Sequence, residues 1–308
     1  MKTSTLTLAL AAAALWMALP ASADDGDADL SCASGPLSNA SRTDDYTLKT
    51  PLRVVGLTAQ GQLLCLSDRK PEKARVIGTL AGFAGSDSRL IGIDFRPQDG
   101  LLYGVGNGGG LYRVDTAGAT LTPVGQLSTL PDPAASSFGV DFNPAANALR
   151  IVANTGQNLR QSFANLGSAN PLAATAVDGI LGYTTSATPG PTALGVVGAA
   201  YTNNDLSTNT ATSLFVLDVN LGQVALQSPA NAGFLVATGK LGVAATGGGL
   251  DIYSVLRGNA TVAQRALATL AAGADTGLYD LDLLTGRATL RGYFAQLVTD
   301  IAVPLNQY

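Results

Sequence analysis

The 308-residue chain contains no histidine, and its single tryptophan and both methionines lie within the first 17 residues. Without histidine, neither a Ser-His-Asp nor a Cys-His catalytic arrangement can be built, and zinc loses its commonest nitrogen ligand. The sequence also lacks the Gly-x-x-x-x-Gly-Lys-Ser/Thr loop that binds phosphates. We therefore identify no catalytic residues, and any chemistry would have to use carboxylates, lysine, tyrosine or an oxygen-bound metal ion.

Positive charge is scarce as well. The chain has 18 Lys and Arg residues against 22 Asp and Glu residues, which gives a net charge of −4 at pH 7. Nucleic-acid binding depends on clusters of Lys and Arg that contact phosphates. The densest basic stretch, residues 69–73, is interrupted by Pro71 and Glu72 and is interpreted as a solvated loop. We expect no nucleic-acid partner.

The N-terminal 23 residues have the pattern of a secretory signal peptide. Lys2 supplies the positive start, residues 6–19 are mostly apolar, and Ala21-Ser-Ala23 is a small-residue cleavage site. The apolar stretch is shorter than the roughly 20 residues that a membrane-spanning helix needs, although an uncleaved anchor is the alternative. We expect cleavage, export to the periplasm or the extracellular space, and no membrane span afterwards.

Cysteine is limited to Cys32 and Cys65. In an oxidising compartment, two cysteines usually form one disulfide, which would tie the N-terminal segment to the first repeat. Two buried free thiols are the alternative, and a metal site is disfavoured because histidine is absent.

A repeat runs through the rest of the chain. Arg89-Leu-Ile-Gly-Ile-Asp-Phe95 resembles Ser136-Ser-Phe-Gly-Val-Asp-Phe142, and weaker copies follow. The aligned position falls at residues 94, 141, 200, 251 and 300, in steps of 47, 59, 51 and 49 residues. A period near 50 made of short apolar strands indicates a β-propeller. A two-sheet sandwich, the alternative fold, does not predict the repeat.

The strand pattern predicts about five four-stranded blades, with six as the alternative. A single strand at residues 297–303 is left over, and the first unit lacks one strand, so we expect the C-terminal strand to complete the first blade and close the ring. The Ala-rich stretch 260–274 could be a helix, but the repeat requires a strand there. The predicted division is a signal peptide (1–23), a flexible leader (24–49), the propeller (50–304) and a tail (305–308).

Four stretches carry a resemblance to a known family: Arg53-Val-Val-Gly-Leu-Thr-Ala59, the Gly-x-Asp-Phe-x-Pro pair ending at Pro97 and Pro144, Arg150-Ile-Val-Ala-Asn-Thr-Gly-Gln-Asn-Leu-Arg160, and Ala199-Ala-Tyr-Thr-Asn-Asn204. Over about residues 50–304 the chain resembles the bacterial DUF4394 domain. The resemblance implies a propeller fold and export, and it implies no activity.

Carboxylates at the aligned repeat position are the candidate metal ligands. Four of the five units carry one there, at Asp94, Asp141, Asp251 and Asp300. The strand concerned should lie closest to the central channel. Converging carboxylates would suit a hard cation such as calcium or a general acid and base. Alternatively, each carboxylate locks its blade to the next by accepting backbone N–H bonds.

Asn154, Asn158 and Arg160 form a second candidate, for ligand binding. We align Arg160 with Tyr112 and Phe215 of other units, so that an arginine replaces an aromatic residue. Such a departure often marks a site. Pairing with a channel aspartate is the other interpretation of Arg160.

These observations favour an exported, monomeric, non-enzymatic propeller that binds or scaffolds a protein or glycan at one face. The alternative is a calcium-assisted hydrolase or lactonase-like enzyme that uses the channel carboxylates. A third hypothesis is a purely structural envelope component.

Overall fold

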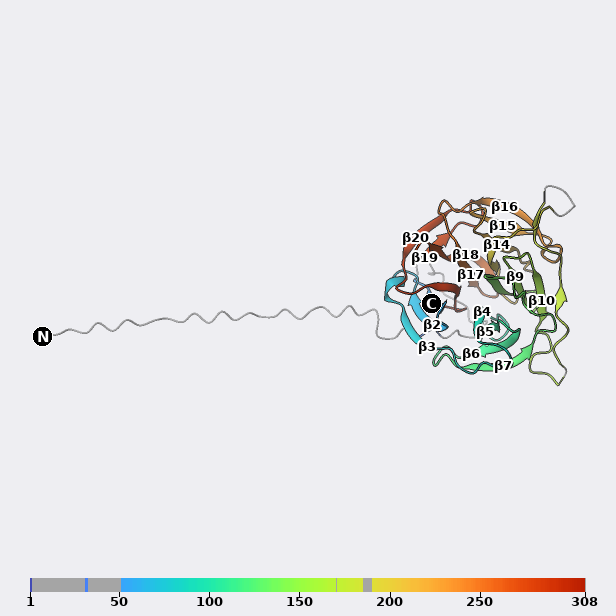
Figure 1. The fold of residues 1–308 in the computed structure, drawn as a ribbon, viewed down its shortest axis with the longest axis horizontal. Helices are drawn as coiled ribbons and strands as arrows, with labels where there is room; N and C mark the ends of the chain where they lie inside the picture. Colours follow the sequence, from blue (N-terminus) through green and yellow to red (C-terminus); the bar gives the residue numbers. More distant parts are fainter. Residues whose placement is uncertain (2–30, 33–50, 170, 185–189, 308) are drawn as a thin grey trace.

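The structure is a computed structural model that describes residues 1, 31–32, 51–169, 171–184 and 190–307. Within these ranges, 21 strands form five sheets that follow one another around a central axis in chain order (Figure 1). The predicted five-bladed β-propeller is confirmed. The predicted signal peptide and most of the predicted leader lie outside the described residues.

Each blade is an antiparallel sheet whose first strand is innermost. Blade 1 contains β21 (Val298–Ala302), β1 (Arg53–Thr58), β2 (Gln62–Ser67) and β3 (Arg75–Thr79), and blade 2 contains β4 (Leu90–Phe95), β5 (Leu102–Gly106), β6 (Gly110–Val114) and β7 (Leu121–Gln126). Blade 3 contains β8 (Phe138–Asn143), β9 (Ala148–Ala153), β10 (Asn158–Ser162) and β11 (Ala176–Val177). Blade 4 contains β13 (Val196–Tyr201), β14 (Leu214–Asp218), β15 (Gln223–Gln227) and β16 (Phe234–Lys240), and blade 5 contains β17 (Gly247–Arg257), β18 (Ala260–Ala272), β19 (Asp275–Leu281) and β20 (Ala288–Tyr293). Two single-turn 3₁₀ helices, Pro71–Lys73 and Ala230–Ala232, lie in connections.

The apolar core is divided among the five junctions between blades. Tyr103 of blade 2 packs edge-to-face against Phe142 and Phe163 of blade 3, with ring centroids 5.6 and 5.5 Å apart. The inner strands β4 and β13 are buried at every residue, whereas the outer strand β7 is mostly exposed. Burial on both faces explains why the inner strands are continuous apolar runs rather than alternating ones.

The ring closes as the sequence predicts. β21 pairs with β1 in antiparallel register, with Gly56 opposite Ile301, so the C-terminal strand is the innermost member of blade 1. The Cys32–Cys65 disulfide is present and connects the N-terminal segment to β2. Both ends of the propeller chain are therefore attached to the same blade.

Two ambiguous regions are resolved. The Ala-rich stretch is strand β18, as the repeat requires. The long connection between blades 3 and 4 contributes the two-residue strand β12 (Gly182–Tyr183), which pairs in parallel with β16 at the outer edge of blade 4. The extra strand thus extends an existing blade and does not begin a sixth.

No helix in the described part of the chain is both long enough and apolar enough to cross a membrane.

Candidate functional site

Glycines in the inner strands set the distance between blades. Gly92, Gly139 and Gly249 each precede a candidate aspartate by two residues. A Cβ atom added to Gly139 would lie 2.5 Å from the backbone nitrogen of Ala199 in the next blade, and one on Gly249 would lie 2.4 Å from Oδ1 of Asp300. The Gly-x-Asp spacing of the repeat therefore allows neighbouring inner strands to approach within reach of the aspartate.

The four aspartates use this proximity to join blades. Oδ2 of Asp94 accepts the N–H of Phe142 at 2.7 Å, Oδ1 of Asp141 accepts that of Tyr201 at 2.9 Å, and Oδ2 of Asp300 accepts that of Ile93 at 2.9 Å. Asp251 accepts the N–H of Val303 in the same way. We call these four residues the Asp ring. Its geometry fits the blade-lock interpretation.

Blade 4 has Ala200 at the aligned position and uses another device. Asn204 donates from Nδ2 to the carbonyl oxygen of Ile252 at 2.9 Å, and its own N–H donates to Oγ of Ser254 at 2.8 Å. Asn204 belongs to the Ala199–Asn204 stretch that resembles the family, and the structure explains it as the fifth junction.

The Asp ring is buried, with exposed fractions of 6% or less. Burial raises the pKa of Asp94, Asp141 and Asp300 well above 3.8, and repulsion from neighbouring ring carboxylates adds to the rise. For Asp251, burial raises the pKa to about 6, while the N–H groups of Val303 and Ile252 act in the opposite direction. The ring therefore holds acidic groups that resist ionisation.

Three members of the ring could hold a cation. One carboxylate oxygen from each of Asp94, Asp141 and Asp251 lies within 4.8 Å of the others. Oxygens at this spacing can all lie 2.3–2.6 Å from one calcium ion. The predicted ligand Asp300 is not part of this group of three. Because these side chains are buried, a substrate has no direct path to an ion there.

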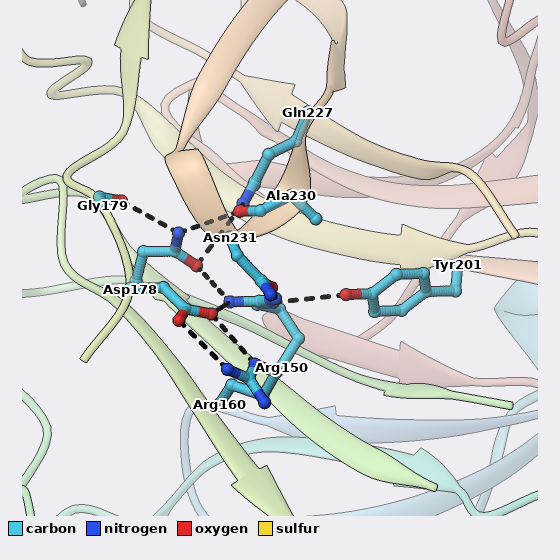
Figure 2. Close-up of polar contacts among 9 residues, drawn as sticks. Arg150, Arg160, Asp178, Gly179, Tyr201, Gln227, Ala230 and Asn231 are labelled. Carbon is cyan, nitrogen blue, oxygen red and sulfur yellow. Dashed lines mark hydrogen bonds and ion pairs between the residues drawn. The ribbon is translucent and has the colours of Figure 1, made fainter. Parts of the chain in front are cut away.

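A second buried polar cluster, which the sequence reasoning missed, surrounds Arg150 on β9 (Figure 2). The Arg150 side chain is 1% exposed, and its Nη1 donates to Oδ2 of Asp178 at 2.6 Å and to Oδ1 of Asn158 at 2.8 Å. Its Nη2 donates to Oδ1 of Asn231 at 2.7 Å, and its Nε donates to the hydroxyl of Tyr201 at 3.3 Å. The cluster ties blade 3, the connection that follows it, and blade 4 together.

The alignment of Arg160 with Tyr112 and Phe215 is wrong. Asp141 lies opposite Arg150 in the ladder, as Asp94 lies opposite Tyr103 and Ala200 lies opposite Phe215. The arginine that replaces an aromatic residue is therefore Arg150. The error arose because Leu214–Asp218 is the second strand of its blade and not the third. Arg150 was within the family-like stretch, and only the strand register reveals its position.

Arg160, Asn158 and Asn154 do not converge on one site. Arg160 lies beside Arg150 on β10 and pairs with Asp178 at 3.1 Å, not with a channel aspartate. Asn158 is buried in the Arg150 cluster, where Nδ2 donates to the carbonyl oxygens of Gly179 and Ala230. Asn154 lies elsewhere, at the end of the channel where the inner strands begin.

At that end of the channel is a cavity of about 510 Å³, which we call the mouth. It is lined by the first residues of β4, β8, β17 and β21 and by the preceding loop residues, among them Arg89, Ser136 and Ser137. Such a volume is typical of small-molecule sites, which span about 300–1,000 Å³. The mouth is the largest concave feature that we describe, and it was not singled out from the sequence.

Two equivalent asparagines shape the rim of the mouth. Oδ1 of Asn107 accepts the N–H groups of Ser88 and Arg89 at 2.9 and 3.0 Å. Oδ1 of Asn154 accepts those of Ser136 and Ser137 at 3.1 and 3.4 Å. Arg89 and Ser136 are the first residues of the two clearest repeat copies, so the repeat boundaries were a signal for the rim.

A family model described as "Domain of unknown function (DUF4394)" matches residues 62–302. No curated protein matches the chain. Among solved structures, the chain is similar to one from a nidogen/laminin complex (11% identity, 84% of this chain and 100% of that chain, TM-score 0.46). It is also similar to a structural-genomics protein of unknown function from Bacteroides thetaiotaomicron (15%, 87% and 71%, TM-score 0.43) and to the Dos1 propeller (13%, 81% and 56%, TM-score 0.38).

Proposed function

Because the chain belongs to the DUF4394 family, whose description assigns no function, we propose a function from its geometry: an exported β-propeller that acts as a binding module through the channel mouth. The observation that carries the proposal is the mouth itself. It combines a cavity of about 510 Å³ with rim residues held by Asn107 and Asn154. Preformed pockets with a few fixed polar groups are typical of ligand sites.

Export is supported by the N-terminal pattern of residues 1–23 and by the Cys32–Cys65 disulfide, which is typical of oxidising compartments. The test is the mass of the protein recovered from the periplasm or medium. Cleavage after Ala23 is expected, and recovery of the uncleaved chain in the cytoplasm would contradict export.

Binding can be tested with a blocked mouth. We propose Ser137→Trp, which places an indole in the cavity, and Thr289→Trp on the exposed outer strand β20 as the matched control. A library of small fragments is screened by ligand-observed NMR against the mature protein. Fragments should bind to the wild type and the control and lose binding to Ser137→Trp. Equal binding to all three proteins, or to none, would contradict the proposal.

A calcium-assisted hydrolase is the second candidate function, and the convergence of three carboxylate oxygens within 4.8 Å favours it. A bound ion raises the melting temperature, since a ligand at about 100 times its Kd stabilises by about 2.7 kcal/mol. The test compares the melting temperature in EDTA and in millimolar calcium, for the wild type and for the double variant Asp94→Asn, Asp141→Asn. Lack of a calcium-dependent rise in the wild type would remove this candidate.

A further inference from the structure

The mouth carries positive charge and hydrogen-bond donors. Arg89 is the one charged side chain among its lining residues, and no carboxylate lines it, the Asp ring included. Within the described part of the chain, the Arg89 guanidinium makes no ion pair and no side-chain hydrogen bond. Its backbone is nevertheless fixed, because Asn107 accepts its N–H. A planar donor in this situation is suited to a carboxylate or a similar anion.

The hydroxyl groups around the mouth fall into two classes. Thr246 and Thr299 donate their protons to the backbone carbonyl oxygens of Ala271 and Leu57. Ser136 differs, because its Oγ accepts a hydrogen bond from Nδ2 of Asn154 at 2.9 Å, which leaves its own proton to donate. Asn154 is therefore a positioning residue for this donor and not a ligand-binding residue in its own right.

The remaining lining is apolar. It includes Leu90, Ile91, Val298 and Leu297, and the Leu297 side chain is 44% exposed. The single aromatic residue of the lining, Phe138, is only 6% exposed. The mouth thus offers aliphatic contact area, but it lacks an exposed aromatic ring on which the face of a sugar could stack.

From these three observations we infer that the mouth binds a small organic carboxylate with a short aliphatic body. The carboxylate lies between Arg89 and the Ser136 hydroxyl, and the aliphatic part lies against Ile91 and Leu297. This inference rests on the proposed function, since it names the ligand class of the same cavity. It replaces the wider expectation of a protein or glycan ligand with one chemistry.

The test uses three probes with the same six-carbon body: hexanoate, hexan-1-ol and hexylammonium. Each is titrated into ¹⁵N-labelled mature protein, and the Kd is obtained from amide shifts around Ser137 and Gly248. Hexanoate should bind at least about tenfold more tightly than the other two, because its charge-assisted hydrogen bonds to Arg89 have no counterpart in them. Arg89→Gln should remove that advantage, and Arg113→Gln on the exposed face of β6 should leave it unchanged.

The outcomes separate the inference from the proposed function. If hexanol or hexylammonium binds as tightly as hexanoate at the same amides, the inference is wrong while the mouth remains a binding site. If no probe shifts these amides and the fragment screen also finds no binder, both are wrong. The tripeptide Ala-Ala-Leu with a free or an amidated C-terminus identifies the source of the carboxylate. Preference for the free tripeptide over hexanoate would assign the site to peptide C-termini and overturn the small-acid assignment.

Discussion

The propeller contains two buried polar clusters that differ in how their charge is compensated. The Asp ring holds four carboxyl groups that are satisfied by backbone N–H donors of the next blade. In the Arg150 cluster, a buried guanidinium is paired with the carboxylate of Asp178 and with amide oxygens. Burial without a counter-charge raises a carboxyl pKa, whereas a paired ion keeps its charge. The same fold thus contains a pH-sensitive and a charge-dependent junction.

Arg150→Met should have the largest effect. It leaves Asp178, Asn158 and Asn231 without their shared donor in a buried environment. Breaking a buried ion pair from one side costs about 3–5 kcal/mol, and at roughly 2–4 °C per kcal/mol the melting temperature should fall by about 10 °C. Circular dichroism measures the loss. Arg113→Met on an exposed strand position is the control, and an equal fall in both variants would contradict the structural role of Arg150.

Raising the pH should weaken the Asp ring and not the Arg150 cluster. The folded-state pKa of Asp251 is about 6, above its ordinary value of 3.8, because the side chain is buried. The folded state therefore holds the proton more tightly than the unfolded state. The stability is fully present below about pH 4 and is lost as the pH rises through about 6.

Two pKa units correspond to about 3 kcal/mol for this group, and the raised pKa values of Asp94, Asp141 and Asp300 extend the loss to higher pH. The check is the melting temperature of the wild type and of Asp251→Asn between pH 4 and 8. The variant should show a flatter profile. A wild-type melting temperature that rises over this interval would show that the ring is ionised or occupied by a cation.

Gly139→Ala tests whether the ring depends on the close approach of the inner strands. The new Cβ would lie 2.5 Å from the backbone nitrogen of Ala199, which cannot move without shifting β13. Overpacking of this kind costs about 1–3 kcal/mol. Gly247→Ala is the matched control, because its nearest neighbour, Cβ of Ala271, is 4.0 Å away. Chemical denaturation should separate the two variants, and equal stability would show that the strands can move apart freely.

Two substitutions of Asp141 should separate its charge from its role as an acceptor. Asp141→Asn keeps an oxygen for the N–H of Tyr201 and removes the charge, so it should change stability little, or increase it, at pH 8. Asp141→Leu leaves that N–H without an acceptor, and a buried unsatisfied donor costs about 1–3 kcal/mol. The difference is measured by denaturant unfolding of both variants. If the Asn variant is the less stable one, the ring requires its charge.

The sequence predicted the ring better than it predicted the Arg150 cluster, for a physical reason. The aspartates recur with the repeat, because every junction between inner strands has the same geometry and needs the same Gly-x-Asp device. Arg150 occurs once, and its partners Asp178 and Asn231 come from a connection of irregular length and from the next blade. The mouth was missed because its residues, such as Arg89 and Leu297, converge from several blades.

By itself, the sequence determined the propeller, its closure by the C-terminal strand, the disulfide and the inner-strand carboxylates, since strand period, cysteine count and spacing are local properties of the chain. The number of blades was settled by the tertiary structure, which assigns β12 to the edge of blade 4. Tertiary structure also decided that Arg150 and not Arg160 replaces the aromatic residue, and that Asn154 supports the mouth while Asn158 supports a junction. These outcomes depend on strand register and on contacts between distant segments, which no local pattern encodes.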